Sequence, residues 1–140
     1  MKNAKLFFAA FILSFSFFFS RCTPDTTGLV SSTEEVLVKN VWSIDYYFNN
    51  QDMTNNFGSS RLLFSSTGSV GYQKNGETVS GTWSKTSDAS NNEFITLHFN
   101  TKDADIIRLN ESWMLTSRST SSIQFVETGG TGIFFRIKVQ

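Results

Sequence analysis

From Val36 to the end of the chain, apolar and polar residues alternate in short runs separated by polar turns. A period of two is typical of β-strands that bury one face, and no long helical period is present. The pattern predicts about eight strands. Their inward positions are predicted to be Trp42, Ile44, Tyr46, Phe48, Leu62, Phe64, Val70, Tyr72, Val79, Gly81, Trp83, Ile95, Leu97, Phe99, Trp113, Leu115, Ile123, Phe125, Ile133, Phe135, Ile137 and Val139.

The connections between these runs are short, and Asn75-Gly76 is a strong two-residue hairpin signal. Strands joined so tightly are expected to be antiparallel neighbours. The sequence therefore predicts an all-β fold, an up-and-down antiparallel barrel of about eight strands that leaves no free edge. A two-sheet sandwich is the alternative arrangement.

The longest early connection, residues 49–60, carries two apolar residues, Met53 and Phe57. Asp52 could begin a single helical turn here, or the segment could be a plain hairpin loop. We expect the segment to fold over the end of the barrel beside the first strand. It either plugs that end or forms a binding mouth, whose candidate residues are Tyr46, Phe48, Met53, Phe57 and Tyr72.

The inward face is rich in aromatic residues, which has two interpretations. Small barrels pack their interior with side chains, which would make this face a solid core. The same residues could instead line a cup for a small hydrophobic ligand. Because buried Tyr and Trp need partners for their polar atoms, the sequence also predicts water or a ligand near one end.

The first 22 residues have the pattern of an export signal. Lys2 and Lys5 precede the 14-residue apolar run Leu6–Phe19, which is too short to span a bilayer comfortably. The predicted division is a signal peptide over residues 1–21, a tether over residues 22–35 and the barrel domain over residues 36–140.

Cys22, the only cysteine, directly follows this run. The segment Phe19–Cys22 resembles a bacterial lipoprotein signal, in which the peptidase cuts just before a cysteine that receives a diacylglyceryl group with palmitate-type acyl chains. Arg21 departs from that pattern, which normally has a small residue there. Ordinary cleavage near Cys22 is the alternative. The resemblance implies an outer-membrane lipoprotein of the cell envelope, held to the membrane by its N-terminal lipid.

The barrel segment resembles the small lipocalin-like lipoproteins of Bacteroidetes over residues 38–139. The resemblance implies a calycin-type barrel and carries no catalytic residues. Asn40 stands where larger lipocalins have the glycine of their Gly-x-Trp motif, which counts against a full-size pocket. The matching motifs are Trp42, Gly76-Glu77, Gly81-Thr82-Trp83-Ser84 and Leu109-Asn110-Glu111-Ser112-Trp113.

Charge and polar chemistry exclude several function classes. Removing the signal takes three of the 12 basic residues and leaves 12 acidic ones, a net charge of −3 that gives no reason to expect nucleic acid. The single histidine, His98, is predicted on the outer face, so no Ser-His-Asp, Cys-His or zinc set can form. Residues 101–105 are expected to form a solvated turn, not a calcium loop, and residues 129–132 a hairpin turn.

These features together predict a monomeric, non-enzymatic envelope protein without cofactor or metal. The first hypothesis is binding of a small hydrophobic or amphipathic molecule. The second is an interaction or accessory protein with a solid barrel, which contacts protein or glycan through its surface.

Overall fold

The computed structural model describes residues 31–140 of the chain. They form eight strands, two short α-helices and one 3-10 helix. In order these are α1 (Thr33–Lys39), β1 (Val41–Phe48), η1 (Thr54–Phe57), β2 (Arg61–Phe64), β3 (Ser69–Lys74), β4 (Glu77–Ser87), β5 (Glu93–Phe99), α2 (Ala104–Ile107), β6 (Ser112–Arg118), β7 (Ser122–Glu127) and β8 (Phe134–Val139).

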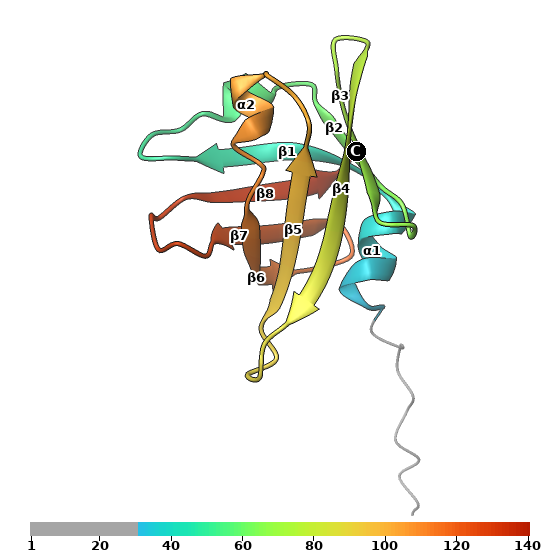
Figure 1. Ribbon diagram of the computed structural model, residues 1–140, viewed down its shortest axis with the longest axis vertical. Coiled ribbons are helices and arrows are strands. Elements are labelled where there is room, and N and C mark those ends of the chain that lie inside the picture. Colours follow the sequence, from blue (N-terminus) through green and yellow to red (C-terminus); the bar gives the residue numbers. More distant parts are fainter. Residues whose placement is uncertain (1–30) are drawn as a thin grey trace, which may run out of the picture.

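The strands close into one barrel (Figure 1). Each strand pairs antiparallel with its neighbour in sequence, and β8 pairs with β1 to complete the ring. The predicted up-and-down barrel is therefore confirmed, and the sandwich is excluded. The predicted hairpin at Asn75-Gly76 is also present, with positive φ angles of 52° and 83° between the paired residues Lys74 and Glu77.

The interior of the barrel is filled with side chains. The largest buried side chains, each under 2% exposed, come from several strands and from η1. Contacts between aromatic rings link them across the interior. The centroids of Trp113 and Phe135, for example, are 4.6 Å apart. The fully buried aromatic residues are Trp42, Trp113, Tyr47, Phe57, Phe99, Phe125 and Phe135.

The indole groups find their partners inside the protein, so the three Trp give no reason to expect water or a ligand beside them. Trp42 donates to the Leu37 carbonyl at 2.9 Å, and Trp113 donates to the Leu109 carbonyl at 2.9 Å. The third indole, of Trp83, donates to a loop carbonyl at 2.9 Å. Backbone oxygens satisfy all three indole donors.

The predicted inward positions of Tyr46 and Phe48 are wrong. The pairing of β1 with β8 shifts by one residue between Ile44 and Tyr46, as a β-bulge does. Beyond the shift, Tyr47 points into the core and is 1% exposed, while Tyr46 and Phe48 are half-buried on the outside. A period of two carries no sign of such an insertion.

Helix α1 closes one end of the barrel, in a segment predicted to be tether and strand. Ser32 caps it: its hydroxyl accepts from the Glu35 amide, and the Glu35 carboxylate accepts from the Ser32 amide. The helix buries Thr33, Val36 and Leu37. The folded domain thus begins before residue 36. The predicted signal peptide and Cys22 lie outside the described residues.

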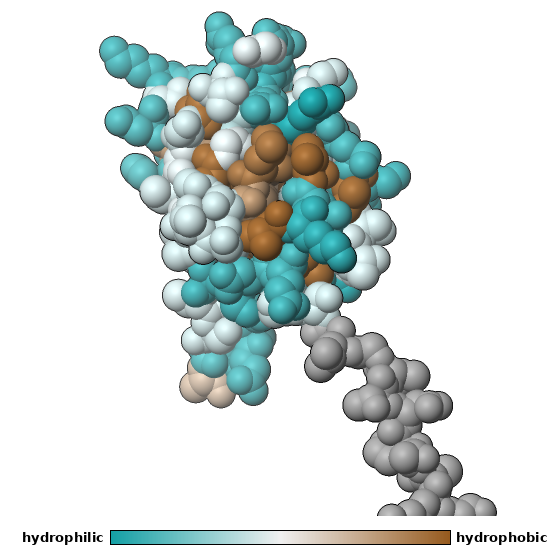
Figure 2. Space-filling view, turned by 90° about the vertical axis from the view of Figure 1, so that its right-hand side faces the viewer, coloured by the Kyte–Doolittle hydropathy of each residue, from teal (hydrophilic) through white to brown (hydrophobic). Residues whose placement is uncertain are grey.

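The opposite end of the barrel carries η1 and α2, close to the tip of the β3–β4 hairpin (Figure 1). Residues 49–60 contain the predicted helical turn, as the 3-10 helix η1. None of the helices in residues 31–140 has the length and apolar character needed to cross a membrane. The outside is mostly polar, although Figure 2 shows apolar side chains gathered in one area of the face drawn there.

Candidate functional site

The 3-10 helix η1 plugs its end of the barrel. Phe57 is fully buried, and its ring lies 4.7 Å from that of Tyr47. Met53 is partly buried against the core. The structure therefore brings Met53 and Phe57 together, as the sequence predicted, but with Tyr47 beside them in place of Tyr46 and Phe48.

Polar contacts fasten this plug to its neighbours. The Asn56 side-chain amide donates to Asp105 of α2 at 2.9 Å, and the Lys74 ammonium of β3 donates to the Asn56 carbonyl. The Tyr47 hydroxyl donates to the Arg108 carbonyl at 3.3 Å. Burial raises the pKa of Tyr47 to about 12, so the phenol stays protonated and acts as a donor at neutral pH.

A pocket of about 240 Å³ lies at this same end, between the β3–β4 hairpin and the segment that leads into α2. We call it the mouth pocket. Its apolar lining comes from Tyr72, Val79 and Ile106, and its charged lining from Lys74, Glu77 and Asp103. With Asn75 and Thr101 included, polar and charged residues form most of the lining, so the pocket has a mixed, amphipathic character.

Two hydroxyl groups lie near the base of the mouth pocket. Burial raises the pKa of Tyr72, and the neighbouring Ser60 hydroxyl opposes that shift. Ser60 is itself fully buried, and its Oγ has no partner of good hydrogen-bonding geometry among the described residues. The Ser60 hydroxyl therefore has hydrogen-bonding capacity that the described fold does not use fully.

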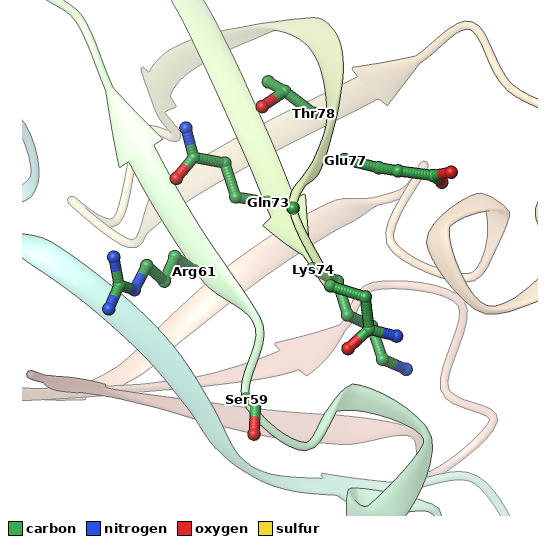
Figure 3. A pocket seen from close by; sticks show the side chains of 8 residues that line it. Ser59, Arg61, Gln73, Lys74, Glu77 and Thr78 are labelled. Atoms are coloured by element: carbon green, nitrogen blue, oxygen red, sulfur yellow. The ribbon is translucent and has the colours of Figure 1, made fainter.

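A second pocket, of about 290 Å³, lies on the other side of the β3–β4 hairpin (Figure 3). Its row of paired residues, Arg61, Gln73 and Thr78, comes from three neighbouring strands. In Figure 3 the side chains of Arg61 and Glu77 point in opposite directions. The polar groups here do not converge on one point, so this pocket is an open polar groove and a weaker candidate site.

The residues considered for other chemistry have structural roles. Asp103 caps α2 by accepting from the amides of Asp105 and Ile106 at 2.9 and 3.3 Å, so the predicted solvated turn at residues 101–105 leads into a helix. Glu127 accepts from the Gly129 amide at 2.8 Å within the β7–β8 turn, which confirms a hairpin turn there. Among residues 31–140 no three His, Cys, Asp or Glu residues are grouped as metal ligands would be.

His98 lies on the outer face of β5, as predicted, and is exposed. Tyr72 alone of the predicted mouth residues lines the mouth pocket.

The sequence pattern does not identify the partners of Tyr72 in this pocket. The alternation predicts Val79 only as an inward core residue. Ile106 directly follows residues 101–105, the acidic stretch predicted to be a solvated turn. Its spacing of three from Leu109, which is also buried, is the signal that could have revealed an apolar turn over the barrel end.

Comparison with known proteins supports the fold. No family model and no curated protein matches the sequence. The solved structure of a DUF4847 family protein from Bacteroides vulgatus matches with a TM-score of 0.57 and 12% sequence identity, over 76% of this chain and 96% of that one. Similarity at this level of identity shows a shared fold and is consistent with a lipocalin-like barrel.

Proposed function

We propose that this protein is a lipid-anchored, lipocalin-like protein of the cell envelope that binds a small amphipathic molecule without catalysing a reaction. The observation that carries the proposal is the mouth pocket, where Tyr72, Val79 and Ile106 meet the charged side chains of Lys74, Glu77 and Asp103. An amphipathic molecule would place its apolar part on the first group and its polar part among the second.

The filled interior limits the size of this ligand. Lipocalin-type binding needs a cavity inside the barrel, yet aromatic side chains occupy the interior here. The mouth pocket, at about 240 Å³, is smaller than the roughly 300–1,000 Å³ of sites for drug-sized molecules. The proposed ligand is therefore small and sits at the end of the barrel.

The ionisable groups near the pocket favour binding over catalysis. A general base works best when its pKa lies near the working pH. Burial moves the pKa of Tyr72 upward, away from neutral pH, so its phenol keeps its proton and can donate a hydrogen bond. His98, the single histidine, lies on the outer face of β5 and does not line the pocket.

The anchor part of the proposal depends on Cys22 and the apolar run before it. The described domain is a small folded unit without a membrane-spanning helix in residues 31–140, which is compatible with attachment through a lipid. A lipid-anchored monomer facing the periplasm or the outside is the expected form.

A second candidate function is an interaction protein that uses the outside of a solid barrel to contact protein or glycan. The filled interior favours it, as do the aromatic residues on the outer face. Tyr46 and Phe48 lie 5.3 and 5.2 Å, centroid to centroid, from Phe134 on that face.

A pair of neighbouring substitutions tests the mouth pocket. Val79 lines the pocket, whereas the adjacent Thr78 points to the other side of the same strand and lines the polar groove. A neutral, environment-sensitive naphthalene dye is titrated against wild type, Val79→Gln and Thr78→Gln. We expect saturable binding that Val79→Gln weakens about tenfold, since one buried polar group costs about 1–3 kcal/mol, and that Thr78→Gln leaves unchanged.

Equal dye binding by the two variants, with both still folded, would contradict the mouth pocket as the site. Weak, non-saturating binding to all three proteins would instead favour the second candidate function.

A further inference from the structure

Five apolar residues form a continuous row on the outer face of the barrel, one from each of five adjacent strands. Successive members are paired in register: Phe94 with Met114, Met114 with Val126, Val126 with Phe134, and Phe134 with Phe48. We call this set the outer apolar row. Each member is half-buried, and the core lies on the opposite face of each strand.

The row is narrow and has polar neighbours. Next to it on β7 and β8, Gln124 is paired with Arg136, and Arg136 forms an ion pair with Asp45 at 3.0 Å. Four strand spacings make the row roughly 19 Å long, and it is one residue wide except on β1, where the Tyr46 ring also lies 5.3 Å from that of Phe134. A stable protein dimer buries about 800 Å² on each partner, far more than this row offers. The row suits a weak contact that is occupied only when something holds the two surfaces together.

The chain enters the folded domain beside one end of this row. Thr33, at the start of α1, donates to Glu93 and accepts from Arg118 at 2.8 Å. Glu93 directly precedes Phe94, the first member of the row. Only ten residues separate Thr33 from Cys22, and ten residues span at most about 35 Å. A lipid on Cys22 would hold this end of the row close to the membrane.

We propose that the outer apolar row lies against the phospholipid surface in which Cys22 is anchored. The proposal rests on the lipid anchor of the proposed function and is independent of the mouth ligand. The row contains three Phe side chains, and apolar faces that carry Phe insert at the boundary between lipid headgroups and acyl chains. Because β3 and β4 lie across the ring from β7 and β8, this contact would point the mouth pocket away from the membrane.

The test uses the full chain, produced in a bacterium that processes lipoproteins and reconstituted in phosphatidylcholine–phosphatidylglycerol vesicles with brominated acyl chains. Cys22 is the only native cysteine, and acylation blocks it. A fluorophore is attached at Met114→Cys in the row or, as the matched control, at Ser80→Cys on the exposed face of β4. Bromine quenches fluorophores only at short range.

We expect the label at position 114 to lose most of its emission on brominated vesicles and the label at position 80 to keep it. Adding Phe134→Ser to the Met114→Cys protein should restore emission. Equal emission from both labels on vesicle-bound protein would overturn the proposal and leave the anchor standing. Protein that fails to float with the vesicles would overturn the anchor and this proposal together. An emission change at position 114 that depends on protein concentration and not on bromine would indicate a second copy, and so also contradict the lipid contact.

Discussion

At Gly81 the barrel leaves no room for a side chain. A Cβ atom there would lie 2.4 Å from the His98 carbonyl oxygen and 2.6 Å from Cδ1 of Phe99. The first contact is with the backbone of the paired strand, which cannot move without disturbing the sheet. The glycine thus permits the close approach of β4 and β5 next to Trp83.

Gly81→Ala should therefore destabilise the protein by about 1–3 kcal/mol, the usual cost of overpacking. Gly71 is the matched control, because a Cβ there would meet its nearest neighbour, Cγ2 of Thr78, at an ordinary 3.9 Å. Gly71→Ala should change stability by less than about 0.5 kcal/mol. Urea denaturation of both variants measures the difference, and coinciding midpoints would contradict the predicted clash.

Residue faces could be predicted wherever the alternation runs without interruption. Trp83 is buried and Ser84 exposed, as the pattern of β4 predicts. The prediction failed in β1, where the bulge exchanges the roles of Tyr46 and Tyr47. An inserted residue leaves no trace in the sequence when aromatic residues stand on both sides of it, and two of the candidate mouth residues were misplaced for that reason.

At the scale of elements, α1 is held to the end of the barrel by a small charged cluster. Thr33 and Lys85 both donate to Glu93, the latter at 2.6 Å, while Arg118 donates to Thr33. Burial alone would raise the pKa of Glu93, but these hydrogen bonds and the charges of Lys85 and Arg118 outweigh it and lower the pKa. The folded state therefore favours the ionised carboxylate.

This lowered pKa predicts how stability depends on pH. The stabilisation from Glu93 is present above its unfolded-state pKa of about 4.3 and is lost as the pH falls through the lower folded-state pKa. Glu93→Gln should be less stable than wild type at pH 7 by up to about 1 kcal/mol, a small value because the ion pair is partly exposed. The deficit should shrink at acidic pH.

Urea denaturation of wild type and Glu93→Gln at pH 7 and pH 3 measures this change. Glu111→Gln, at an exposed carboxylate between α2 and β6, is the control for the loss of one carboxylate elsewhere on the domain. A Glu93→Gln deficit of the same size at both pH values would refute the role of the charge.

The strands were predictable as elements, but the helices that close the barrel were not. The capping box of Ser32 and Glu35 is readable in the sequence, yet α1 has seven residues and α2 four, too few to show a helical period. Both helices owe their stability to docking on the barrel ends. The mouth pocket was out of reach for the same reason, since α2 supplies Ile106 to it.

At the scale of the whole molecule, the closed ring and its filled interior decide where binding can occur. Side chains from all eight strands, α1, η1 and α2 contribute to a single core. A ligand can therefore reach the end of the barrel or its outside, which are the locations of the mouth pocket and of the outer apolar row. The filled interior itself admits no ligand.

Titration of the purified protein with a fluorescent long-chain fatty acid tests whether the barrel interior admits a ligand. The acyl chain of such a fatty acid fits the open cavity of a lipocalin-type barrel but is too long for a pocket of about 240 Å³. We predict no saturable uptake by the folded protein. Tight binding of one fatty acid per barrel would contradict the filled interior, and with it the placement of the binding site at the mouth.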